Sequence, residues 1–113
     1  MAVKIFIRRR IPKGEDSKKL FELIKELRRR ATGRPGYISG ESLVSVDDPS
    51  CLLVVSTWRH MDDWKAWEND PERMEIQKKI DEIIGAETVY EGYHYYEEKT
   101  QATLRGYKGW EGG

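Results

Sequence analysis

Apolar and polar residues alternate over the first ten positions of the chain, which is typical of a strand with one buried face. Val3, Ile5 and Ile7 fall on one side of the expected strand 3–10, and we predict that helices cover this side. Phe6 lies on the opposite side, which indicates that this side is not simply exposed to water.

Two stretches with apolar residues at helical spacing predict helices. The first follows a turn at Pro12–Gly14 and ends at Ala31, and either Asp16 or Ser17 should cap its start. Its expected buried stripe consists of Leu20, Phe21, Leu23, Ile24 and Leu27.

The second helical stretch is predicted to have two parts. It breaks at Asp70 and Pro71, an N-cap followed by proline at the first helical position, and it stops at Gly85. Trp64 and Trp67 are three residues apart and therefore share one face of the first part. The stripe of the second part contains Met74, Ile76, Gln77, Ile80, Ile83 and Ile84. Gln77 is the one polar side chain in that stripe.

Three further strands complete the pattern. Tyr37–Val46 and Cys51–Trp58 flank the turn signal Asp47–Ser50 and should form an antiparallel hairpin. The second of them is almost continuously apolar, as expected of a strand covered on both faces. The last strand, Thr88–Glu97, carries several tyrosines around His94.

The order β-α-β-β-α-β predicts an α+β, ferredoxin-like fold, an antiparallel sheet with helices on one face. We assign residues 1–97 to this domain, and residues 98–113 to a tail that is either flexible or clasps a dimer partner. The uncovered sheet face would expose a larger apolar patch than a soluble monomer normally shows. We therefore predict a homodimer in which two sheets pack face to face.

Composition narrows the partners and the location. Twenty basic and twenty acidic residues cancel, so we expect neither nucleic acid nor a membrane as a partner. We interpret the runs Arg8–Arg10 and Arg28–Arg30 as solvated strand-end and helix-end charges. Cys51 is alone, which favours a reducing compartment. The sequence lacks a signal-peptide pattern and an apolar run of membrane length, so we expect a soluble, cytoplasmic protein.

Few residues are candidates for chemistry, because the sequence has no phosphate loop, metal-ligand pair or nucleophile elbow. His60 is expected in an exposed corner, and His94 is either a hydrogen-bonded structural residue or a proton-transfer group. Trp64 and Trp67 are either core residues or pocket walls. Gln77 is either partly exposed or points into a cavity, where burial would require a hydrogen-bond partner.

Several short motifs resemble the antibiotic biosynthesis monooxygenase (ABM) family of dimeric α/β barrels. They are Pro12–Gly14 after the first strand, Pro35–Tyr37 before the second, and Val55–Trp58 followed by Asp62–Trp67 and Pro71–Arg73. The resemblance implies the fold predicted above. The family is mixed in activity, since it includes cofactor-free oxygenases of quinol-like substrates, heme-degrading enzymes and many proteins without a known role.

Residue by residue, the resemblance argues against heme degradation. Those members use an asparagine on the first strand, a tryptophan on the helix and a histidine iron ligand ten residues later. Trp67 matches the tryptophan, but Ile7 stands at the asparagine position and Gln77 at the histidine position. We therefore predict no heme, no metal and no other cofactor.

The resemblance leaves two functions open. The first is a cofactor-free monooxygenase of a quinol-like or polycyclic aromatic molecule, whose phenolate must be held in a dry pocket. Trp67, Trp64 and Ile7 would line that pocket, Gln77 would donate to the substrate, and His94 or a neighbouring tyrosine would act as acid or base. The second is a non-enzymatic dimer that binds a small ligand or partner. A cavity of about a few hundred cubic ångströms would favour the first function, and a filled core the second.

Overall fold

The computed structural model describes residues 1–96, so the predicted tail 98–113 lies outside the described residues. The elements follow in the order β1 (Val3–Arg10), α1 (Glu15–Ala31), β2 (Tyr37–Val44), β3 (Cys51–Trp58), α2 (Met61–Glu68), α3 (Pro71–Ile84) and β4 (Tyr90–His94).

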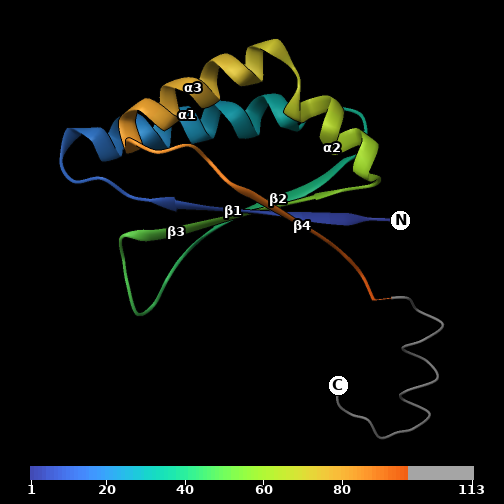
Figure 1. Cartoon of the computed structure of the whole chain (residues 1–113), viewed down its shortest axis with the longest axis horizontal. Coiled ribbons are helices and arrows are strands. Elements are labelled where there is room, and N and C mark those ends of the chain that lie inside the picture. Colours follow the sequence, from blue (N-terminus) through green and yellow to red (C-terminus); the bar gives the residue numbers. More distant parts are fainter. Residues whose placement is uncertain (97–113) are drawn as a thin grey trace, which may run out of the picture.

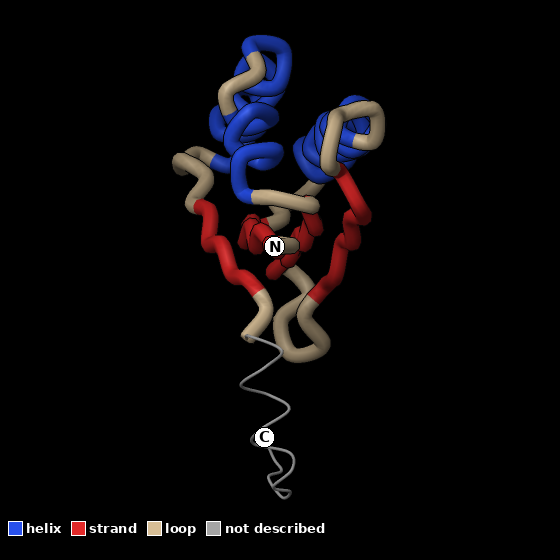
Figure 2. The backbone as a smooth tube through the Cα atoms, turned by 90° about the vertical axis from the view of Figure 1, so that its right-hand side faces the viewer, coloured by secondary structure: helices blue, strands red, loops and turns tan. Residues whose placement is uncertain are grey.

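The four strands form one antiparallel sheet in the order β2-β3-β1-β4. All three helices lie on one side of this sheet, with α1 and α3 side by side and α2 near the end where β1 begins (Figure 1). Figure 2, turned by 90°, shows the helices as a separate layer above the curved strands. This arrangement confirms the predicted α+β, ferredoxin-like fold.

The core lies between the helices and the inner sheet face, in two clusters. In the first, Val3, Ile5 and Ile7 of β1 pack with the tryptophans at positions 58, 64 and 67. In the second, side chains of α1, α3 and β3 meet further along the sheet: Leu20, Ile24, Leu52, Ile76 and Ile80. The period-two alternation of β1 therefore buries the side of the strand that the sequence predicts.

Several boundaries and exposures differ from the sequence prediction. The start of α1 has Gly14 at its N-cap, with φ at 69°, and no side chain caps it. Instead, the Ser17 hydroxyl donates to the Gly14 carbonyl at 2.8 Å, so the prediction of a cap by Asp16 or Ser17 is wrong. Phe21 and Met74 are 38% and 54% exposed, because each lies at the edge of its helical stripe.

The ends of two strands differ from the prediction, and β3 has one covered face within the chain. β2 ends at Val44 and β4 spans only Tyr90–His94, both shorter than predicted. The helices cover one face of β3, where Leu52 is buried, whereas Leu53 on the opposite face keeps partial exposure. The second face of β3 is the one that the predicted dimer partner would cover, so its expected cover stays a prediction.

The break between α2 and α3 follows the sequence signals. The Asp70 carboxylate accepts a hydrogen bond from the Arg73 backbone N–H at 3.0 Å, and Pro71 occupies the first turn of α3. Gly85 ends α3 in the left-handed conformation, with φ at 82°. The predicted cap, proline and stop are all confirmed.

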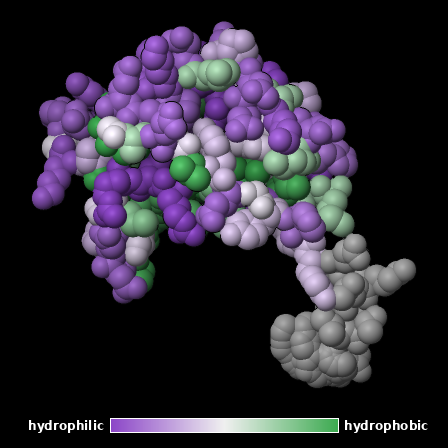
Figure 3. Space-filling view, in the orientation of Figure 1, coloured by the Kyte–Doolittle hydropathy of each residue, from purple (hydrophilic) through white to green (hydrophobic). Residues whose placement is uncertain are grey.

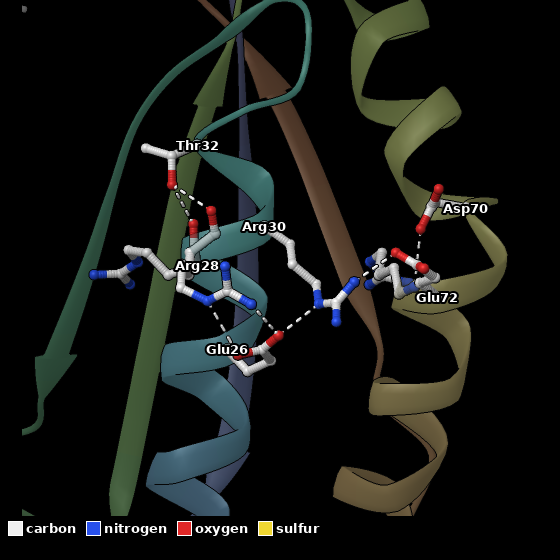
Figure 4. A network of polar contacts seen from close by, with 8 residues as sticks. Glu26, Arg28, Arg30, Thr32, Asp70 and Glu72 are labelled. Atoms are coloured by element: carbon white, nitrogen blue, oxygen red, sulfur yellow. Dashed lines mark hydrogen bonds and ion pairs between the residues drawn. The ribbon is translucent and has the colours of Figure 1, made fainter.

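A charged network ties α1 to α3 on the outside of the helical layer. Arg30 reaches from α1 to Glu72 of α3 and also binds Glu26 (Figure 4). Hydrogen bonds from Arg29 and then Arg30 hold the pKa of Glu26 below its usual value. Because these groups are open to solvent, we expect only a modest contribution to stability.

The two sides of the molecule differ in polarity. The outer surface of the helices is mostly hydrophilic, and apolar residues gather at the level of the sheet (Figure 3). Near or on the uncovered sheet face, Ile38, Leu43, Tyr93 and Tyr95 are each about half exposed. No helix within residues 1–96 is long and apolar enough to cross a membrane.

Gly36 offers a test of the contact between β2 and α2. Its φ is 82°, and a Cβ there would collide with the Asp63 side chain, whereas Gly85 has the same φ and open space around it. We expect Gly85→Ala to lower the free energy of unfolding by about 1 kcal/mol, from the backbone conformation alone.

Gly36→Ala should lower the free energy of unfolding by about 2 kcal/mol or more, because overpacking adds to the same backbone cost. Urea unfolding of both variants measures the difference. Equal losses in the two variants would show that Asp63 yields without cost.

Candidate functional site: a cavity beneath the helices

A small cavity lies between the helical layer and the inner face of the sheet. It holds about 50 Å³ of space that water can occupy. Its outer part lies between α1 and β2, where Gly40 leaves room for the Tyr37 hydroxyl and the Arg28 guanidinium. Its inner part reaches Ile7, Arg9 and residues of α2 and α3.

Aromatic side chains form much of the cavity wall. Trp64 and Trp67 both come from α2, and their spacing of three residues turns them toward the same side of the helix. The Trp64 ring packs edge-to-face against Trp58, with ring centroids 6.0 Å apart, and Trp58 packs in the same way against Tyr37 at 5.3 Å. Both tryptophans of α2 and Ile7 therefore line this cavity, and their predicted contact with a substrate stays a prediction.

Arg9 is the most unusual residue of the site. It continues the inward-facing alternation of β1 after Ile7 and is only 5% exposed. Its guanidinium donates to Thr88 Oγ1 at 3.1 Å and to Gln77 Oε1 at 3.3 Å, while its Nε has no acceptor among the described residues. Burial lowers the pKa of Arg9 to about 10.

Because burial lowers the Arg9 pKa from its usual high value to about 10, the folded state carries a cost on the order of 3 kcal/mol at neutral pH. This cost is present below pH 10 and disappears as the pH rises toward the pKa of the unfolded chain. The interpretation of the whole run Arg8–Arg10 as solvated charge is therefore wrong for its middle member. Arg8 and Arg10 are exposed, and they lie near the carboxylates of Glu91 and Asp48.

Arg73 of α3 is a second buried guanidinium, 3% exposed. Its guanidinium lies against the rings of both Trp64 and Tyr90, with its central carbon 5.3 and 5.1 Å from the two ring centroids, and the two rings contact each other edge-to-face at 5.2 Å. It donates to the Glu68 carbonyl at 3.2 Å and to the Tyr90 hydroxyl. Among the described residues, neither Arg9 nor Arg73 forms an ion pair with a carboxylate.

Gln77 is buried but does not line this cavity. Its carbonyl oxygen accepts from Arg9, and its amide nitrogen donates to Asp81 Oδ1 at 2.8 Å and to Thr88 Oγ1 at 2.6 Å. Protein groups thus supply the hydrogen bonds that its burial requires. The structure gives Gln77 a place behind Arg9, so its predicted contact with a substrate stays a prediction.

The two histidines lie away from the cavity. His94 is exposed near the end of β4, where its Nδ1 lies 3.1 Å from the Tyr95 carbonyl oxygen. It lines a hollow on the uncovered sheet face, together with Phe6 and Tyr93. His60 is exposed at the start of α2, as expected. One chain therefore does not bring His94 together with Trp67, and a catalytic role for His94 stays a prediction.

The charged side chains that line the cavity, among the described residues, are all positive. The lining contains the guanidinium groups of Arg9, Arg28 and Arg73, and within residues 1–96 no carboxylate and no imidazole lines the cavity. Such a site can bind and stabilise negative oxygen, but it contains no carboxylate or imidazole base. Sequence reasoning missed Arg9 and Arg73, although the period of β1 and the stripe 73, 76, 77, 80 of α3 pointed to both positions.

The cavity has a smaller volume than a typical ligand pocket, which measures roughly 300–1,000 Å³. At about 50 Å³ it accepts a small group such as a carboxylate, and an aromatic ring requires the helices or the wall side chains to move apart. By size alone, the structure lies nearer to a filled core than to an open substrate pocket.

The chain is thus a small α+β protein with a cavity between its sheet and its helices. A family model described as antibiotic biosynthesis monooxygenase matches residues 2–79, and the chain belongs to this family. No curated protein sequence matches the chain.

Solved structures share the fold at low sequence identity. A conserved protein from Methanosarcina mazei Go1 is 18% identical with a TM-score of 0.76, covering 85% of this chain and 94% of that one. SnoaB, a cofactor-independent oxygenase from Streptomyces nogalater, is 10% identical with a TM-score of 0.72, and the coverage is again 85% and 94%. A conserved protein of unknown function from Bacteroides thetaiotaomicron is 19% identical with a TM-score of 0.72, covering 83% and 97%. These likenesses show the fold.

The residues of the cavity do not fit heme. Ile7 presents only carbon atoms to the cavity, the Gln77 amide is bound by protein groups, and neither histidine lies at the cavity. Among residues 1–96, no group of histidine, cysteine and carboxylate side chains is arranged to hold a metal ion.

We expect hemin to bind weakly or not at all, because a carboxamide held by Arg9 and Thr88 cannot replace an imidazole ligand. A hemin titration followed at the Soret band measures this. His60→Ala serves as the control for adventitious binding at the exposed histidine. A saturable one-to-one spectrum that persists in His60→Ala would contradict the prediction.

Proposed function

We propose that this protein binds an electron-rich, quinol-like or polycyclic aromatic molecule between its helices and sheet and oxidises it with dioxygen, without a cofactor. The observation that carries the proposal is the cavity walled by Trp58, Trp64 and Trp67 and closed at its inner end by guanidinium groups. Membership of the antibiotic biosynthesis monooxygenase family supports it. SnoaB, which shares the fold, is described as a cofactor-independent oxygenase.

The proposed reaction balances without an added reductant. The substrate phenolate gives one electron to dioxygen, and the ring radical and superoxide then combine to form a carbon–oxygen bond. Loss of the ring proton and cleavage of the oxygen–oxygen bond release one water and leave a quinone carbonyl. One ring C–H and one phenol O–H are thus consumed with one dioxygen, which accepts four electrons from the substrate.

The side chains of the cavity would shield the substrate from water and stabilise its negative charge, and would not transfer protons. The tryptophan wall and Ile7 would exclude water from the reacting ring, and the guanidinium groups would favour the phenolate over the phenol. Gln77 would act behind Arg9, as the partner that fixes the guanidinium in place. A second candidate function, binding of a small aromatic ligand without turnover, is favoured by the small volume and by the lack of a carboxylate or imidazole base in the described lining.

We also propose that the protein works as a homodimer in the cytoplasm. Half-exposed apolar side chains on the uncovered sheet face, such as Leu43 and Tyr93, support a second sheet packed against it. The single cysteine, Cys51, supports a reducing compartment.

Substitutions of Trp67 test whether this residue only packs in the core or also contacts a substrate. It is 5% exposed, and part of its ring faces the cavity, so we expect Trp67→Ala to cost less than the roughly 3–5 kcal/mol of a fully packed tryptophan. The same variant should lose the oxygen uptake that wild type shows with a panel of hydroquinones. Trp67→Phe should keep both stability and uptake.

A matched control for the Trp67 variants is Ile80→Ala, which opens the core away from the cavity and should lower stability by about 2–5 kcal/mol without changing uptake per folded molecule. If wild type consumes no oxygen with any hydroquinone, the enzymatic proposal fails. Binding of the same compounds without consumption would support the second candidate function.

The dimer is tested by sedimentation equilibrium at micromolar concentration, where we expect about twice the chain mass. Leu43→Arg, on the uncovered face opposite Leu53, should shift the protein toward monomer because it places charge in the apolar interface. Val46→Arg is the control, since Val46 is 96% exposed beyond the end of β2. A wild-type monomer would refute the face-to-face arrangement.

A further inference from the structure

We propose that Arg9 and Arg73 form an anion subsite at the inner end of the cavity, and that the substrate is an aromatic acid whose oxyanion is already ionised at neutral pH. This inference rests on the proposed function and narrows it, because it names the charge that the ligand must carry. The juxtaposition that carries it is two buried guanidinium groups on one cavity without a carboxylate paired to either.

The hydrogen bonds of the two guanidinium groups leave donors to spare. Each has five N–H groups. Arg9 uses two of its nitrogens on Thr88 and Gln77, and Arg73 uses two on the Glu68 carbonyl and the Tyr90 hydroxyl. The Nε of Arg9 is fully buried and has no acceptor among the described residues. A carboxylate matches the fork of a guanidinium and would accept from these free donors.

The carboxylate nearest to Arg9 in its polar network does not contact the guanidinium directly. Asp81 Oδ1 accepts from Thr88 at 2.7 Å and from Gln77 at 2.8 Å, so one layer of neutral groups separates this carboxylate from the guanidinium. The network orients Arg9 and leaves its positive charge facing the cavity.

The charges around the cavity favour entry of an anion from the side of β2. Arg28 lines that outer end. Arg73 also borders a surface hollow on the far side, where the acidic residues Glu68 and Asp81 balance the positive charges of Arg73 and Lys78. Gly40 of β2 pairs with Ser56 of β3, and Ser56 pairs with Ile5 of β1. Arg9 therefore lies two strand spacings across the sheet and four residues further along β1, roughly 16 Å from Gly40.

A pair of ligands with and without the charge tests the subsite in the wild-type protein. Titration calorimetry with a dihydroxybenzoate and with the dihydroxybenzamide of the same ring pattern should show the acid binding at least about tenfold more tightly, as expected for charge-assisted hydrogen bonds. Equal affinities would overturn the subsite while leaving the proposed function intact. Binding of neither compound, nor of any hydroquinone in the panel, would overturn both.

Two variants assign the charge preference to named residues. Arg9→Met and, independently, Arg73→Met should each remove the preference for the acid. The denaturation midpoint of ligand-free Arg9→Met should not fall, because a buried charge without a direct partner is removed. Arg8→Met and Arg10→Met flank Arg9 on the exposed side of β1 and should keep the preference. If Arg9→Met and Arg73→Met both keep the preference for the acid over the amide, the subsite is refuted.

An inorganic anion separates the oxyanion from the ring. Nitrate has the planar shape of a carboxylate and fits the present cavity volume. It should compete with the benzoate in wild type. It should not raise the melting temperature of Arg9→Met, whereas it should raise that of Arg8→Met as it does that of wild type. Equal stabilisation of Arg8→Met and Arg9→Met would show a general salt effect and would count against the subsite.

Discussion

The central position of β1 constrains the rest of the structure, because a strand between two antiparallel neighbours must place every second side chain beneath the helices. In this chain the rule buries three apolar residues and then, one step further, Arg9. The apolar residues pack against the tryptophans of β3 and α2. Arg9 needs polar partners instead, and these come from α3 and from the segment before β4. One strand thus sets both the apolar core and the polar end of the cavity.

The same constraint explains the chemistry of the site. Tryptophan and aliphatic side chains surround the buried guanidinium groups of Arg9 and Arg73, and charge interactions strengthen as the local dielectric falls. The folded protein bears the cost of burying those charges, and a negative ligand would offset it. Binding and activation of an oxyanion suit this environment better than proton shuttling, which would require a carboxylate or imidazole at the cavity. The fold is shared with proteins of different activity, so these side chains, rather than the architecture, distinguish the present site.

Much of the fold follows from local patterns. Alternation marks β1, the continuous apolar run marks β3, and the sequence Asp70–Pro71 marks the start of α3, all within a residue or two of their observed bounds. The errors have local causes as well. Gly14 begins α1 through its backbone, without the side-chain cap that the flanking polar residues suggested. Phe21 and Met74 belong to the apolar stripes but lie at their edges, where the sheet does not reach.

The sequence by itself determined the order of elements, the buried face of β1, most of the buried stripes of α1 and α3, and the positions of Trp64 and Trp67 on one side of α2. Tertiary structure alone decided the fate of the polar groups. Arg9 donates hydrogen bonds to Gln77, which lies 68 positions later in the sequence, and to Thr88, which lies 79 positions later. These partners allow the charged Arg9 side chain to be buried rather than solvated. Tertiary structure also decided that the cavity is small and that the exposed His94 does not line it. Periodicity fixes a direction for each side chain, but desolvation and hydrogen bonding depend on which distant residues meet it there.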